Sequence, residues 1–260
     1  MAMADGGGAR FDIARVASRT FDLVGRNLVP FGTAAFIFAG LPYFILLMVQ
    51  PSMLAAGDPS GALPIIVIGA LVSFLAGMVL QAALTRASVD DLSGKGVNLG
   101  AAIGTGLAIL LPMIGLGLLM GLGIGVGLIL LIVPGIYLAL CWAVAAPVLV
   151  VERLGVIASI QRSTALTQNH RWAILGLVIL YVVVILVLQA IVGALVPGAG
   201  AAMMGLPGGD TGTPIIAIVL LTLVQVITSM IATVGIAAVY FELRQVKDGI
   251  GVDQLAQVFA

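Results

Sequence analysis

The sequence predicts an all-α membrane protein with six transmembrane helices, cytoplasmic amphipathic interfacial helices and both termini in the cytoplasm. Three observations support this prediction: an extreme apolar composition, long uncharged stretches, and basic residues confined to alternate loops. Hydrophobic residues make up 62% of the 260 positions and charged residues 8%, whereas a soluble domain has about 25% charged residues. Too few polar residues remain to cover a water-exposed surface, so lipid must surround most of the chain.

The first element expected along the chain is an amphipathic helix at 10–28, after a disordered segment at 1–9. Its charged residues recur every three or four positions and therefore share one face: Asp12, Arg15, Arg19, Asp22 and Arg26. Such a helix can lie in the headgroup plane with Arg15, Arg19 and Arg26 toward anionic lipid. It can equally pack on the protein's own cytoplasmic loops. A second interfacial segment is predicted at 155–171 and a third, weaker one at 98–107.

The six spans follow from the lengths of the uncharged stretches. A crossing needs about 20 apolar residues, and four of the five stretches fit one helix each. The stretch 96–151 is too long for one crossing, so we expect it to turn back at Pro134–Gly135. The predicted helices are 29–50, 63–86, 108–132, 136–152, 172–196 and 214–241, within a transmembrane domain at 29–247 and before a cytoplasmic tail at 248–260.

The distribution of positive charge gives the orientation. All 11 Lys and Arg residues fall before the first helix, after the last, or in the loops after the second and fourth. The alternate loops contain only Asp58 and Asp210. Because cytoplasmic loops are enriched in Lys and Arg, both termini are predicted to be cytoplasmic.

Helix 108–132 is rich in glycine, with Gly117, Gly121 and Gly125 spaced four apart. Small residues at this spacing allow close helix approach in lipid. The stripe favours close packing within the chain or self-association with another copy; a flexible gate is the alternative. Prolines inside the helices, at 42, 112 and 147, predict bends.

Few polar groups lie inside the predicted spans. No ionisable residue falls near the bilayer centre, which argues against ion-coupled transport. The deepest polar side chains, Gln189 and Gln225, are expected at similar depth. They are interpreted either as an interhelical hydrogen-bonded pair or as a substrate-binding pair.

One polar cluster is expected at the cytoplasmic interface: Glu152, Arg153, Arg162, His170 and Arg171. It fits either ordinary positive-inside topology with surface pairing, or a site for an anionic headgroup or a partner protein. Glu152 with His170 is the only pair that could serve a lipid-modifying enzyme. One His and one Cys give no pattern for a metal, cofactor or nucleophile site, and the net charge of zero gives no reason to expect nucleic acid binding.

A family resemblance is carried by the stretch from Pro134 to Trp172. Its matching positions are Pro134-Gly135-Ile136-Tyr137, Pro147, Glu152, Gly155, Ala158, Ser163, Leu166-Thr167 and Trp172. This stretch resembles the membrane domain of glycerophosphoryl diester phosphodiesterases and the related YciC-like bacterial inner-membrane proteins. The resemblance implies a membrane part whose catalytic barrel is a separate domain, so it implies no catalytic residue here.

We therefore expect a non-catalytic inner-membrane protein that contacts anionic lipids or other membrane proteins, with no cofactor. A small transporter or channel for an apolar or uncharged substrate is the second hypothesis. A lipid-modifying membrane enzyme is the third.

Overall fold

The computed structural model describes residues 11–55, 59–196 and 215–248, and within these ranges the regular structure is helical. The elements are α1 Ile13–Arg26, α2 Leu28–Ala35, the π-helix η1 Phe36–Gly40, α3 Leu41–Ala55, α4 Pro59–Leu92, α5 Leu99–Ala108, α6 Leu110–Leu130, α7 Ile132–Cys141, α8 Ala145–Glu152, α9 Val156–Thr167, α10 Arg171–Leu195 and α12 Ile215–Asp248. The predicted disordered segment 1–9, and the C-terminal tail beyond Asp248, lie outside the described residues.

The six predicted spans are confirmed as six helices long and apolar enough to cross a membrane. They are Leu28–Val49, Leu63–Leu92, Leu110–Leu130, Ile132–Glu152, Arg171–Leu195 and Ile215–Asp248. The first is built from α2, η1 and most of α3, and the fourth from α7 and α8. The chain is thus a polytopic helical membrane protein.

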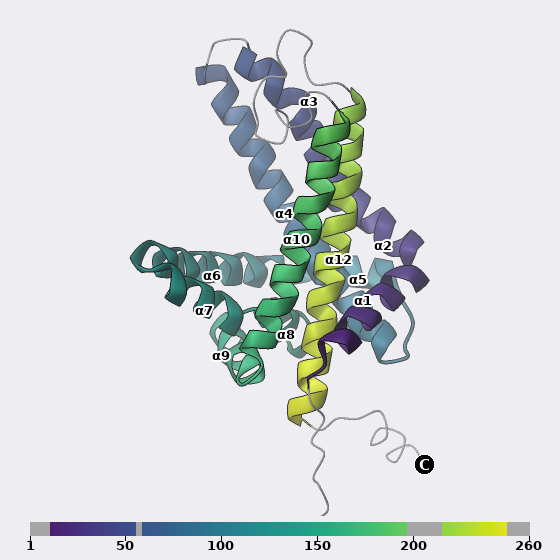
Figure 1. The fold of residues 1–260 in the computed structure, drawn as a ribbon, viewed down its shortest axis with the longest axis vertical. Helices are drawn as coiled ribbons and strands as arrows, with labels where there is room; N and C mark the ends of the chain where they lie inside the picture. The colour runs from purple at the N-terminus through teal and green to yellow at the C-terminus, as the bar shows by residue number, and fades with distance from the viewer. Residues whose placement is uncertain (1–10, 56–58, 197–214, 249–260) are drawn as a thin grey trace, which may run out of the picture.

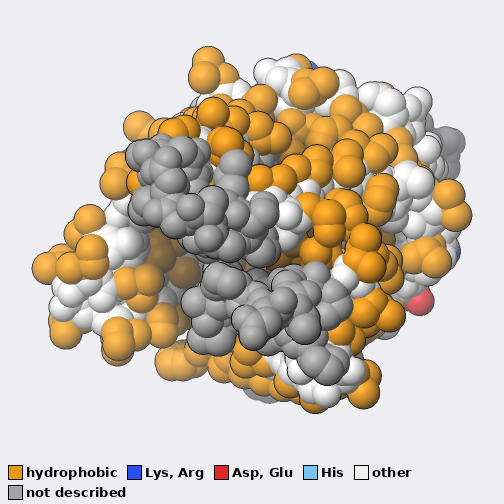
Figure 2. All heavy atoms as spheres, turned by 90° about the horizontal axis from the view of Figure 1, so that it is seen from above, with side chains coloured by type: hydrophobic (Ala, Val, Ile, Leu, Met, Phe, Trp, Pro, Cys, Tyr) orange, Lys and Arg blue, Asp and Glu red, His pale blue; other side chains and the backbone are white. Residues whose placement is uncertain are grey.

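The third and fourth spans do not run alongside the others. Figure 1 shows α10 and α12 as neighbouring long helices, with α6 lying across their direction and projecting to one side together with α7. The tip of this α6–α7 arm is highly exposed, with Ile129 at 86% and Val133 at 77%. Seen from above, the projecting lobe on the left carries hydrophobic side chains (Figure 2).

The turn of the α6–α7 hairpin falls at Leu131 rather than at the predicted Pro134–Gly135. Leu131 is extended (φ −159°, ψ 138°), and α7 begins at Ile132. Pro134 therefore lies in the first turn of α7, where the missing amide hydrogen costs no helical bond. Gly135 permits the hairpin to close, because a Cβ there would lie 2.6 Å from the backbone nitrogen of Leu128.

The prolines at 112 and 147 follow helix breaks rather than bending continuous helices. Pro112 is the third residue of α6, after the break at Ile109, and Pro147 is the third of α8, after a break at 142–144. Pro42 follows the π-helix η1 directly. Since Pro42 cannot donate to the carbonyl four residues before it, the regular α-helical pattern is interrupted there.

The predicted glycine stripe is divided between different surroundings. A Cβ at Gly117 would meet Met78 of α4 at 2.6 Å, whereas one at Gly121 or Gly125 would meet nothing within 4 Å. Gly123 makes a close contact as well, since a Cβ there would lie 2.5 Å from the Trp142 ring. Only part of the stripe therefore packs within this chain.

The core is organised around α12, which packs against α1, α4, α10 and η1. Its side chains enter buried clusters with residues of α1 and α4, including Leu23, Leu84 and Met230. Gly40 of η1 lets that turn approach α12 closely, since a Cβ there would lie 2.6 Å from Val226. The first and last helices of the described chain are thereby held side by side.

Candidate functional site

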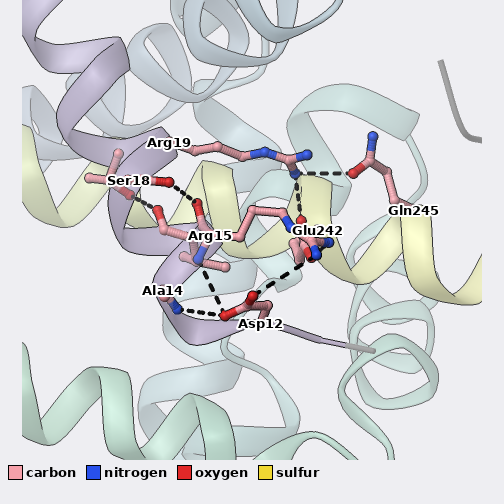
Figure 3. A network of polar contacts seen from close by, with 9 residues as sticks. Asp12, Ala14, Arg15, Ser18, Arg19, Glu242 and Gln245 are labelled. Carbon is pink, nitrogen blue, oxygen red and sulfur yellow. Dashed lines mark hydrogen bonds and ion pairs between the residues drawn. The ribbon is translucent and has the colours of Figure 1, made fainter. Parts of the chain in front are cut away.

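Helix α1 is fastened to the end of α12 by a buried carboxylate. Glu242 is fully buried, and it accepts hydrogen bonds from Arg15 Nη1 at 2.8 Å and from Arg19 Nη1 at 2.5 Å. Arg19 Nη1 also donates to Gln245 Oε1 at 3.0 Å. Figure 3 shows the two arginines reaching from α1 to this carboxylate and amide on α12. We call these four residues the clasp.

Local sequence explains why α1 can present both arginines to one partner. Asp12 caps the helix, accepting from the backbone amide of Ala14 at 2.9 Å. Arg15 and Arg19 are four residues apart and share a face. The interpretation in which this helix packs on the protein itself is thus seen in the fold, although the partner is α12 rather than a loop. Contact with lipid headgroups stays a prediction.

A second polar cluster joins α8, α9 and α12, and we call it the α8–α12 cluster. Tyr240, fully buried, donates to Glu152 Oε1 at 2.9 Å, and Arg162 Nε lies 3.3 Å from Glu152 Oε2. Arg162 Nη2 also donates to Asp248 at 2.5 Å. Burial lowers the pKa of Arg162, but the hydrogen bond to Asp248 and the negative charges of Glu152 and Asp248 outweigh it. The pKa of Arg162 is therefore raised, and its charge is held.

The remaining predicted headgroup residues lie apart from this cluster. Arg26 pairs with Asp91 of α4 at 3.1 Å. Arg171 donates to the Tyr137 hydroxyl, and its guanidinium lies 4.6 Å from the centroid of that ring. Arg153 is exposed and takes a left-handed conformation (φ 52°) after α8.

His170 does not join Glu152 in the part of the chain that the structure describes. Its ring lies 5.6 Å from the ring of Phe11, and its buried Nδ1 has no hydrogen-bond partner among the described residues. Glu152 is instead engaged by Tyr240 and Arg162. The pair named for a lipid-modifying enzyme is therefore not assembled by any described contact.

A pocket of about 370 Å³ with a mixed lining, which we call the polar pocket, lies among η1, α3, α4 and α12, within the membrane-spanning helices. Its polar lining comes from Tyr43, Ser73, Gln81, Gln225, Ser229 and Thr233. Gln225 thus faces the pocket, whereas Gln189 is not among the lining residues, and no hydrogen bond within the described ranges joins the two. Gln189 and Gln225 were selected as the polar residues deepest in the predicted spans, and Gln81 was missed because it lies nearer the end of its span.

An apolar groove of about 340 Å³ adjoins this pocket between α3 and α4. Its walls are Leu41, Pro42, Ile45, Leu46, Val49, Ile65, Ile66, Gly69 and Val72. Leu46 lines both the groove and the polar pocket, so the two are neighbours across one side chain.

Residues 118–250, just over half of the chain, match the family described as the membrane domain of glycerophosphoryl diester phosphodiesterase. The chain belongs to this family. No curated protein and no solved structure matches it. The family match includes most of the α6–α7 arm, the α8–α12 cluster and Glu242. It excludes the clasp arginines of α1 and the α3 and α4 walls of the pocket, so these features of this membrane domain come from outside the matched region.

Proposed function

We propose that this membrane domain is a non-catalytic accessory module of a bacterial-type inner membrane that works by contact with lipids and membrane partners. The observation that supports the proposal is the α6–α7 arm, which projects from the body with apolar side chains exposed around its tip. An apolar projection of this kind is stable only when lipid or another protein covers it. We propose lipid as the cover, because the arm lies beside long apolar helices and its own helices are apolar enough to lie in hydrocarbon.

We call the end of the helices that carries the Lys and Arg residues, including Arg153 and Arg162, the basic end. The arrangement of charge there agrees with an accessory role. Glu242 is engaged by two arginines, and Glu152 by Arg162 and Tyr240. These carboxylates are committed to holding helices together rather than converging on an open cleft. Arg153 is exposed and has no ion pair among the described residues, which makes it the arginine most available to an anionic headgroup.

Spin-label accessibility at the arm tip tests the lipid contact. A nitroxide is attached to Ile129→Cys in a Cys141→Ser background, with the purified chain in nanodiscs. We expect collisions with oxygen, which concentrates in hydrocarbon, and few with a water-soluble nickel chelate. A matched label at Ile157→Cys on α9, exposed at 66% beside the polar clusters, should show the reverse. Nickel access at position 129, or a label shielded from both reagents, would contradict lipid as the cover.

Headgroup contact at the basic end has its own test. Lipid that copurifies with the chain is identified by mass spectrometry and compared with that of Arg153→Gln. Lower enrichment of anionic lipid with Arg153→Gln than with the unaltered chain would support the contact. Equal enrichment would contradict it. If Arg26→Gln lowered the enrichment instead, the contact would lie on α1.

A carrier for an uncharged substrate is the second candidate, because the polar pocket lies inside the spanning region and none of its lining residues is charged. Transport of a labelled neutral lipid between leaflets of a proteoliposome would favour it. Equal transfer rates with and without the protein would contradict a carrier function, and the accessory role would then be the only candidate left.

A further inference from the structure

The geometry points to a binding site for an uncharged lipid bearing a free hydroxyl, such as a diacylglycerol, in the polar pocket and its adjoining apolar groove. This site lies on the η1–α3–α4–α12 side of the molecule and does not involve the α6–α7 arm. The proposal therefore goes beyond the accessory role and can be tested independently of it.

The polar pocket offers hydrogen bonds that the protein itself leaves open. The hydroxyls of Ser73 and Thr233 each donate to a backbone carbonyl of their own helix, at 2.8 Å in both cases. The carboxamides of Gln81 and Gln225 have no hydrogen-bond partner among the described residues, and both line the pocket. A carboxamide in hydrocarbon without a partner is costly. A ligand that supplies both a donor and an acceptor, as a hydroxyl does, would satisfy them.

The charge of the lining determines which head the pocket accepts. Among the residues that the structure describes, its lining includes no Lys, Arg, His, Asp or Glu. A phosphate in such a place would be a buried anion without a counter-ion, which is strongly unfavourable. Hydroxyl and ester groups carry no such penalty, so a neutral glycerolipid fits where a phospholipid head does not.

The apolar groove supplies the place for an acyl chain. It lies next to the pocket across Leu46, and its walls are apolar side chains and one glycine. On α4 the groove uses residues 65–72 and the pocket residues 73–81. Because α4 runs toward the basic end, the pocket lies nearer the middle of its span and the groove nearer the opposite end, so the acyl chain would point away from the basic end. Each cavity is within the size range of small-molecule sites.

The local backbone keeps the pocket open. A Cβ added at Gly77 would meet nothing within 4 Å, so this wall faces free space. On the other wall, η1 places Phe38 and Ala39 at the pocket with a π-helical turn, a feature that recurs at functional sites.

Photolabelling with a diazirine diacylglycerol tests the site in the purified full chain reconstituted in nanodiscs. The labelled peptides are identified by mass spectrometry and are expected to contain residues 38–46, 73–81 or 225–236. Unlabelled diacylglycerol should compete. Triacylglycerol, which has no hydroxyl, and phosphatidylglycerol, which is charged, should compete much less. Equal competition by all three lipids would overturn the proposal, since it would show an unspecific lipid contact.

Two kinds of variant test the hydrogen bonds to the ligand and the room for the ligand separately. Gln81→Leu and Gln225→Leu should each reduce labelling about threefold, and together about tenfold, from the loss of intramembrane hydrogen bonds. Gly77→Leu fills the pocket and should abolish labelling. The matched controls are Gln189→Leu, a membrane glutamine outside the pocket, and Gly121→Leu, a glycine that also faces open space.

Folding is checked for every variant by its thermal unfolding midpoint and by gel filtration. If the folded pocket variants label as fully as the controls, the site is refuted. If they lose labelling while the spin label at Ile129 keeps its oxygen access, this site is supported independently of the arm.

Discussion

Replacing the buried carboxylate of the clasp should release α1 from α12. Glu242→Gln keeps the size of the side chain and removes the charge that Arg15 and Arg19 share. Removing one partner of a fully buried ion pair costs about 3–5 kcal/mol. Arg15 and Arg19 keep 45% and 25% of their side chains exposed, so solvent screens part of the effect. We therefore expect about 2 kcal/mol, which raises the undocked fraction of α1 about 30-fold.

Cysteine accessibility measures this fraction directly. Val16 on α1 is 2% exposed and packs in a buried cluster with Leu243 of α12, so Val16→Cys is protected while α1 is docked. In a Cys141→Ser background, the rate of maleimide labelling follows the population of the undocked state. Asp22→Asn is the matched control, because Asp22 is an exposed acid on the same helix.

An unchanged labelling rate in Glu242→Gln would refute the reasoning that this carboxylate holds α1. A double-mutant cycle with Arg19→Gln adds a second check. If the two residues interact, the double variant should label much less than the sum of the single effects predicts. Simple additivity would indicate that the contact contributes little.

Two further predictions concern the α7 region. Gly123→Leu should lower the thermal unfolding midpoint, because a side chain there collides with the Trp142 ring, whereas Gly125→Leu, which meets open space, should not. Ser163→Ala should cost about 1 kcal/mol, since the buried hydroxyl of Ser163 on α9 donates to the carbonyl of Cys141 at the end of α7, at 2.9 Å.

The controls for these two predictions use the same assay. Thr164→Ser removes a methyl group but keeps a hydroxyl that bonds within its own helix, so it should be close to neutral. A Gly123 variant as stable as the Gly125 variant would mean that α6 and Trp142 do not pack closely. A neutral Ser163→Ala would mean that the Thr167 hydroxyl, which also donates to the Cys141 carbonyl at 3.2 Å, is sufficient on its own.

The six spans could be predicted because apolar length alone identifies them. The direction of α6 and α7 could not be predicted. A hairpin that leaves and returns at the same end places Arg86 and Arg162 on one side in either case, whether it crosses the membrane or lies across the other helices. The distribution of positive charge therefore does not distinguish the two arrangements. The tilt of the arm is set by packing of α6 against α4, α8 and α9 and of α7 against α9 and α10.

The candidate sites were predicted less completely, for two physical reasons. The periodicity of α1 identified Arg15 and Arg19, but their partner is 227 and 223 residues away, and sequence spacing carries no information at that distance. Depth along a helix identified Gln225 but not which neighbour it faces. The predicted partner was Gln189, and the pocket places Gln81 on its lining instead.

The clasp also has a consequence for biogenesis. Arg15 and Arg19 are synthesised more than 220 residues before Glu242. Throughout most of translation α1 has no buried carboxylate to bind, so its arginines stay hydrated at the membrane surface. The docking of α1 is therefore a late step, available only to a chain whose final helix has been inserted, and a truncated product lacking that helix would leave α1 open to recognition by quality-control proteases.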